Sequence, residues 1–186
     1  MTATDATSGA MRAEHGDIAP AVEEMPYGVY IVGSSRGGKP NGMIADWVMQ
    51  VSFRPHRVAV SFENDSYTLA SIRENHAFTV NLLAHASGAG MGLAQHFIQP
   101  HLASKVRGRG RPLVSSTYEK LDAVDHALTA RGCPILDGAL MWLDCTAEQF
   151  IDVTDHTLVI GHVLDAKVVT SDRPLTSLDI PWPYSG

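Results

Sequence analysis

The chain has 186 residues, of which 45% are hydrophobic and 18% are charged, a composition that suits one globular domain and leaves little room for two. Its formal net charge is −6, so it lacks the basic surface that bulk binding of nucleic acid requires. No apolar run approaches the ~20 residues that span a bilayer, and the polar N-terminus does not have the pattern of a signal peptide.

Composition along the chain predicts three parts. Residues 1–20 predict a flexible polar tail, residues 21–172 a single domain, and residues 173–186 a C-terminal extension that packs on this domain or on a partner subunit. Cys133 and Cys145 do not indicate a disulfide framework and are expected to be small buried hydrophobes, which places the protein in the reducing cytoplasm.

Short β-branched and aromatic runs predict most of the strands. In chain order they are 27–33, which ends in the turn S-S-R-G-G-K-P, then about 48–53, 58–62, 78–83, 139–153 and 157–169. Gly161 predicts a bulge in the last of these runs.

Helical spacing predicts two helices between the strands. Residues 66–76 begin with Ser66 as N-cap and place Leu69 and Ile72 on one side, and residues 88–98 place apolar residues at helical spacing. Residues 99–118 predict a long loop. Many strands and few helices predict a mainly β (α+β) closed barrel with helical decorations.

Several kinds of catalytic and binding site are absent from the sequence. The nine histidines show neither H-E-x-x-H spacing nor a C-x-x-C partner, so we expect no metal site. There is no G-x-S-x-G elbow, no phosphate-binding G-x-x-x-x-G-K-[ST] loop and no dinucleotide-binding G-x-G-x-x-G after a strand. The run R-G-R-G-R at 107–111 is compatible with a phosphate contact and with a solvated loop.

The stretch N-G-M-I-A-D-W-V-M-Q-V-S, residues 41–52, is a poor helix and too apolar for a surface loop. Isolated polar groups among Trp and Met suggest that it lines a cavity for a flat, mostly apolar ligand with polar edges. A flavin meets this description, with haem and pyridoxal phosphate as alternatives. Its phosphate requires N–H groups of the kind that a serine-capped helix N-terminus provides, although Ser66 could simply cap the helix that follows it.

The order of these segments resembles the flavin reductase-like family. The resemblance runs over roughly residues 25–170, through Y-G-V-Y-I-V-G-S, N-G-M-I-A-D-W-V-M-Q-V-S-F-R-P, S-Y-T-L-A-S-I-R-E-N-H-A-F-T-V-N-L-L, E-K-L and D-H-T-L-V-I-G-H-V. It implies an FMN-binding split β-barrel, assembled as a homodimer with two flavin sites at or near the subunit interface. One departure is Asp46, which stands where the family usually has Asn or Ser.

The resemblance also implies which residues bind the cofactor. Those expected to line the flavin are Ser34, Asn41, Ala45, Asp46, Trp47, Val48, Gln50, Val51 and Ser52. Ser66 and Thr68 are expected at its phosphate or ribityl end, with Lys120 as a second phosphate partner. His156 is expected either near the flavin or the incoming nicotinamide, as the one candidate catalytic residue, or as a buried turn histidine bonded to Asp155.

The function that the resemblance implies is an FMN-dependent oxidoreductase of the NAD(P)H:flavin reductase type. Hydride from NADH or NADPH would reach FMN, and electrons would pass to free flavin or to a partner monooxygenase or other acceptor. The alternative is a non-catalytic, flavoredoxin-like electron carrier. The choice between NADH and NADPH, between FMN and FAD, and the identity of the acceptor stay open.

Overall fold

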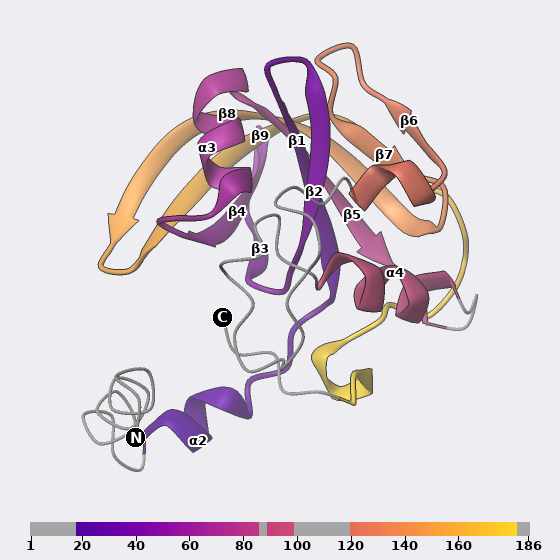
Figure 1. The fold of residues 1–186 in the computed structure, drawn as a ribbon. Coiled ribbons are helices and arrows are strands. Elements are labelled where there is room, and N and C mark those ends of the chain that lie inside the picture. Colours follow the sequence, from indigo (N-terminus) through magenta and orange to yellow (C-terminus); the bar gives the residue numbers. More distant parts are fainter. Residues whose placement is uncertain (1–17, 86–88, 99–119, 182–186) are drawn as a thin grey trace, which may run out of the picture.

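The computed structural model describes residues 18–85, 89–98 and 120–181 (Figure 1). Its centre is a seven-stranded antiparallel sheet in the order β2-β1-β5-β8-β9-β4-β3. The strands of this sheet are β1 (Tyr30–Arg36), β2 (Lys39–Ala45), β3 (Val48–Phe53), β4 (His56–Glu63), β5 (Ala77–Leu83), β8 (Ala139–Val153) and β9 (His156–Val168). The other elements are helices α2 (Ile18–Glu23), α3 (Tyr67–Asn75) and α4 (Ala89–Phe97), the 3-10 turns η2 (Lys120–Ala123) and η3 (Ser177–Asp179), and the small hairpin β6 (His126–Leu128) and β7 (Pro134–Leu136).

The two edge strands of the sheet, β2 and β3, follow each other in the chain. Only Asp46 and Trp47 separate them, so the sheet must curl until its two edges approach each other at this link (Figure 1). The sequence predicts β3 correctly, but residues 39–45 are a strand that it did not predict. The unusual stretch 41–52 is therefore two strands that meet at a two-residue corner made of Asp46 and Trp47.

The β1–β2 hairpin turns at Gly37 and Gly38, whose φ angles are 55° and 77°. Side chains other than glycine rarely adopt this left-handed region, so the two glycines fix the turn between Arg36 and Lys39. The sequence predicted a hairpin turn here, and the structure confirms it.

Two apolar cores lie on opposite faces of β1. Val32 contributes to the first core together with Leu69 and Ile72 of α3, and Ile31 contributes to the second together with Phe97 of α4. Successive residues of a strand point to opposite faces, so β1 is buried on both sides. Figure 1 shows α3 and α4 on the two sides of the β1–β2 hairpin.

Both predicted helices form within a residue of their expected bounds. Ser66 accepts a hydrogen bond from the N–H of Leu69 at 3.0 Å, and His76 ends α3 in the left-handed conformation with φ 50°. The two predicted buried cysteines are confirmed, since neither thiol is exposed. Burial is the largest cause that raises the pKa of Cys133 to about 11 and that of Cys145 to about 12.

Gly161 does not form the bulge that the sequence predicted. It pairs regularly with Val58 on one side and with Ala147 on the other, and the irregularity lies in β8 between Ala147 and Gln149. A Cβ at position 161 would overlap the Phe78 ring, so the glycine allows β9 to approach this ring closely.

The segment after β9 is built into the second core. The N–H of Leu175 donates to the carbonyl of Leu83 at 2.8 Å, and the carbonyl of Leu175 accepts from the N–H of Val29 at 2.9 Å. The Leu175 side chain is fully buried. Trp182 and Tyr184 belong to the C-terminal extension, and their sequence allows packing on a partner subunit or plain anchoring at the surface; both lie outside the described residues. Within the described part of the chain, no helix is long and apolar enough to cross a membrane.

Candidate functional site

The corner between β2 and β3 presents an aromatic side chain at the surface. The Trp47 side chain is 45% exposed, and its ring lies 5.0 Å from that of His156, with the two planes tilted by 38°. The carbonyl of Trp47 accepts a hydrogen bond from the N–H of Ser61 at 3.1 Å, which ties the corner to β4. An exposed indole held in place at a corner offers a flat apolar surface to a ligand.

His156 begins β9, directly after the β8–β9 turn. Its Nδ1 lies 2.9 Å from a carboxylate oxygen of Asp155, and its side chain is 19% exposed. The bond to Asp155 agrees with one of the two alternatives given for this residue, while its position near a flavin or nicotinamide stays a prediction that its contact with the Trp47 ring supports. Its role as a catalytic residue stays a prediction.

The N-terminus of α3 carries hydrogen-bond donors that the described protein does not satisfy. Ser66 caps the helix, but neither the N–H nor the hydroxyl of Thr68 has a hydrogen-bond partner among the described residues. Thr68 is 4% exposed. Buried donors are normally paired, and the N-terminus of a helix favours an anion, so these groups fit a phosphate.

A single stretch of chain, residues 61–66, brings these groups together. Ser61 holds Trp47, Glu63 pairs with His156 in the β4–β9 ladder, and Ser66 opens α3. One short stretch of chain therefore connects the aromatic pair to the unsatisfied helix end. An apolar ring surface next to anion-binding donors matches the chemistry of a flavin mononucleotide.

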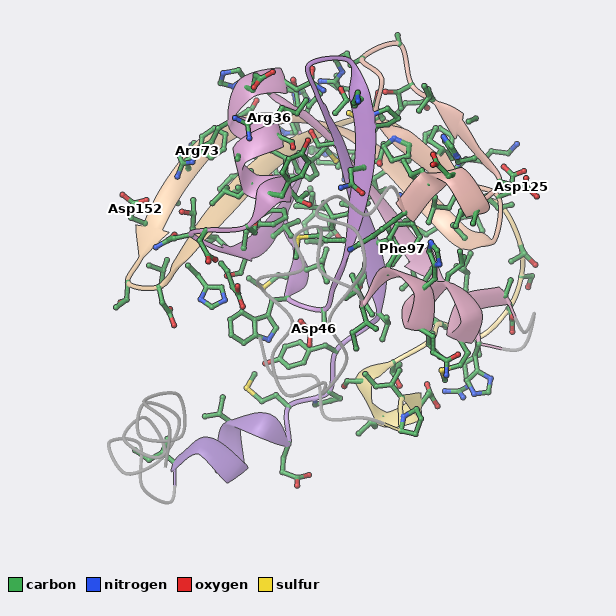
Figure 2. All side chains as sticks on the ribbon, viewed as in Figure 1. Arg36, Asp46, Arg73, Phe97, Asp125 and Asp152 are labelled. Atoms are coloured by element: carbon green, nitrogen blue, oxygen red, sulfur yellow. The ribbon has the colours of Figure 1, made fainter. Side chains whose placement is uncertain are left out.

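Asp46 lies at the corner beside Trp47, at the lower end of β2 in Figure 2. Burial raises the pKa of its carboxyl to about 6, and hydrogen bonds from the backbone N–H groups of Asp46 and Trp47 limit this rise. A carboxyl with such a pKa is in a position to change its charge near neutral pH.

The other predicted ring-lining residues are placed in three ways. Ser34 and Ala45 are buried in the fold, and the Ser34 hydroxyl donates to the carbonyl of Ala77 at 2.8 Å. Asn41 is buried, and its side-chain oxygen accepts from the N–H of Gly42 at 2.8 Å. Along β3, Val48 packs against the first core, while the side chains that reach solvent at least in part are Gln50, Val51 and Ser52.

Lys120 begins η2, which lies against β2. It is buried at the end of α4, where its ammonium donates to the carbonyl of Phe97 at 3.0 Å, and Figure 2 shows Phe97 on the α4 side. Burial lowers its pKa to about 8. This ammonium acts as a cap of the helix C-terminus, and its contact with a phosphate stays a prediction.

Part of the outer face of β3, β4, β9 and β8 is apolar, although Gln149 and His162 also lie on it. Met49 pairs with Ala59 and Ala59 with Ile160, while Ser61 pairs with Leu158 and Leu158 with Ile151. Paired residues share a face, and the alternate residues of β4 and β9, such as Val60 and Val159, point into the first core. Met49 is 59% and Ile151 is 44% exposed. His156 lies on this same outer face, so the site borders an apolar surface.

A separate hollow of about 410 Å³ lies between α4, η2 and the β7–β8 turn. Its lining includes His96, Asp125 and Asp137 but none of the residues predicted to bind flavin. The Nε2 atom of His96 is 2.6 Å from the carbonyl oxygen of Lys120, which joins α4 to η2. This hollow is not the predicted site.

The sequence did not identify Asn64, which bonds the β8–β9 turn to the start of α3. The run N-D-S at 64–66 signals a turn and a helix cap, but nothing in it indicates a partner about 90 residues away. The basic run at 107–111 and most of the predicted loop lie outside the described residues.

Comparison with known proteins adds independent evidence. The sequence model described as "Flavin reductase like domain" matches residues 22–179. The ferric-chelate reductase (NAD(P)H) of Archaeoglobus fulgidus is 29% identical over 160 residues, which cover 86% of each chain.

Solved structures share the fold. The NADH:FAD oxidoreductase SgcE6 of Streptomyces globisporus superposes with a TM-score of 0.71 at 21% identity, covering 89% of this chain and 84% of the other. A nitrilotriacetate monooxygenase component B from Mycobacterium thermoresistibile also gives 0.71, at 23% identity, covering 91% and 83%.

Proposed function

Because the chain belongs to the flavin reductase-like domain family, we propose that it is an FMN-dependent NAD(P)H:flavin reductase. Homology to reductases makes it an oxidoreductase. The choice of FMN is supported by one observation above all, the buried and unpartnered N–H and hydroxyl of Thr68 at the start of α3. These groups fit a terminal phosphate, which FMN carries and riboflavin does not.

Each part of the site then has a task. Thr68 and the N-terminus of α3 bind the phosphate. Trp47 and Val51 cover the ring, and Gln50 and Ser52 offer hydrogen bonds to its polar edge. When bound, the flavin supplies the redox chemistry, accepting hydride from NADH or NADPH and passing electrons to free flavin or to a partner oxygenase. His156 closes the site beside Trp47 and limits the access of water.

The partner oxygenase belongs to the proposal because a solved structure of the same fold is named as a monooxygenase component. The proposed architecture is a split barrel that assembles as a homodimer. The exposed apolar face of β3, β8 and β9 supports the dimer, since apolar patches of this kind mark interfaces and His156 lies at its border. Replacing Met49 by Glu should yield monomers in sedimentation experiments, and a wild-type monomer would contradict the dimer.

The experiment that tests the function compares FMN, FAD and riboflavin. We expect the purified protein to bind FMN more tightly than riboflavin, and to oxidise NADH or NADPH when FMN is present. The variant Thr68→Val keeps the shape of the side chain and removes its hydroxyl. It should weaken FMN binding by about tenfold, the effect of one hydrogen bond to a charged group, and leave riboflavin binding unchanged.

Two results would contradict the proposal. Equal affinity of the wild type for FMN and riboflavin would show that the protein does not bind the phosphate of FMN. Tight FMN binding without oxidation of NADH or NADPH would show that the protein is an electron carrier and not a reductase.

A further inference from the structure

The β8–β9 turn, which carries His156, adopts a conformation that its own sequence disfavours. Thr154 has a φ of 54°, in the left-handed region. A β-branched residue rarely adopts this region, and it stays there only when its surroundings hold it. Some other part of the molecule must therefore fix this turn.

Asn64 is the residue that holds the turn. Its side-chain NH₂ donates to the carbonyl of Thr154 at 3.0 Å, and its backbone N–H donates to the carbonyl of Asp155 at 3.0 Å. Its side-chain oxygen accepts a hydrogen bond from the hydroxyl of Thr157 at 2.8 Å. One asparagine thus bonds residues on both sides of His156.

The contact continues into α3. Thr157 is 1% exposed, and its hydroxyl, besides donating to Asn64, accepts from the guanidinium of Arg73 at 3.2 Å. Arg73 also lies over the Phe150 ring, 4.8 Å from its centre. Figure 2 shows Arg73 and Asp152 on the same side of the molecule, where α3 meets the β8–β9 hairpin. The turn is therefore tied to both ends of the helix.

We propose that Asn64 is a positioning residue for the flavin site. It lies two residues before the cap of α3 and fixes the turn that carries His156, so it couples the phosphate end of the site to its aromatic end. In its effect on cofactor binding, this inference rests on the proposed function. Its effect on the contact between His156 and Trp47 can be measured without any cofactor.

The test uses two matched variants, Asn64→Ala and Asn75→Ala. Asn75 lies at the other end of α3, where its NH₂ group donates to the hydroxyl of Ser35 at 2.9 Å and to the carbonyl of Arg131 at 3.1 Å. Both variants remove a hydrogen-bonding asparagine next to the same helix. Only the first touches the turn that carries His156. A third variant, Asn64→Asp, keeps the acceptor for Thr157 but sets an oxygen against the carbonyl of Thr154.

The first readout is the NMR spectrum of the His156 ring in the protein without cofactor. Its C–H resonances, assigned by their loss in His156→Gln, carry the ring-current shift of Trp47 and lose it in Trp47→Leu. We expect Asn64→Ala and Asn64→Asp to lose most of this shift and Asn75→Ala to keep it. The second readout is FMN affinity, which should fall by about tenfold in the Asn64 variants, the effect of about 1.4 kcal/mol.

The outcomes separate the two proposals. If Asn64→Ala keeps the His156 shift, or if Asn75→Ala loses as much of it, Asn64 is an ordinary structural residue and the inference is wrong. If the shift is lost but FMN affinity equals that of the wild type, the coupling to the phosphate end is wrong. If the wild type itself binds no flavin, the proposed function fails, and the ring shift alone decides whether Asn64 positions His156.

Discussion

Replacing Asp46 by Asn should stabilise the protein at neutral pH and leave its stability unchanged in acid. The carboxyl of Asp46 is partly buried, and its pKa rises from the ordinary 3.8 to about 6 because burial disfavours the charged form. The folded protein therefore holds a proton that the unfolded chain releases between these two pH values. The free energy of unfolding therefore falls as pH rises through this window, and above the window the full destabilisation by the charged carboxylate is present.

The size of the effect follows from the shift. A change of about 2 pKa units corresponds to ~3 kcal/mol at 1.36 kcal/mol per unit, which is an upper limit. Solvent screens a carboxyl that is only partly buried, so we expect about 1 kcal/mol. The amide of Asn keeps the shape and an oxygen that can accept the backbone hydrogen bonds, and it never ionises.

The assay is urea unfolding of the wild type and of Asp46→Asn between about pH 4 and about pH 8. The two free energies of unfolding should agree at the acid end and separate as pH rises towards 7. A difference that is constant over this range would show that Asp46 does not titrate in the window and would refute the reasoning. FMN affinity in the same pH series should diverge in parallel if the carboxyl lies beside the ring.

Three further variants test other parts of the fold. In Gly161→Ala the new methyl would overlap the Phe78 ring and lie 3.3 Å from Cβ of Cys145. Urea unfolding should therefore show a loss of about 1–3 kcal/mol in the free energy of unfolding. An unchanged midpoint would mean that β9 and the Phe78 ring move apart easily. Position 154 has a φ of 54°, and asparagine tolerates this left-handed region better than threonine does. In Thr154→Asn, thermal unfolding should therefore show a gain of about 0.5–1 kcal/mol in the free energy of unfolding. A loss of stability would mean that the threonine is not strained. Leu175→Ala leaves a cavity at a fully buried position and should cost about 3 kcal/mol in urea unfolding, whereas a loss below about 1 kcal/mol would show that the segment is only loosely attached.

Local patterns in the sequence account for much of the fold. Apolar runs predicted six of the seven strands of the main sheet, because a strand such as β5, buried along its whole length, consists mostly of apolar residues. Ser66 and the spacing of Leu69 and Ile72 located α3 to within a residue. The exception is β2, which contains Pro40, Asn41 and Gly42, three residues of low strand propensity. It is nevertheless a strand, because β1 pairs with it along its whole length.

The site was only partly predictable for a related reason. Trp47 stands out in the sequence because it lies among isolated polar groups, and Thr68 because it belongs to the start of a serine-capped helix. The contact between Trp47 and His156 and the bonds of Asn64 to the β8–β9 turn join segments about 90 residues or more apart. A pattern in one sequence reports neighbours along the chain, and such pairs become visible only when the sheet is folded.

The placement of Leu175 between Val29 and Leu83 also bears on the route by which the domain is made. Synthesis proceeds from the N-terminus, so β1 and β5 emerge long before the residue that completes the core between them. Contacts this distant in sequence raise the contact order and slow folding. Until Leu175 has been synthesised, the nascent chain exposes the apolar surface that this residue covers in the folded protein. Chaperones that recognise exposed apolar surface can bind the chain during this interval.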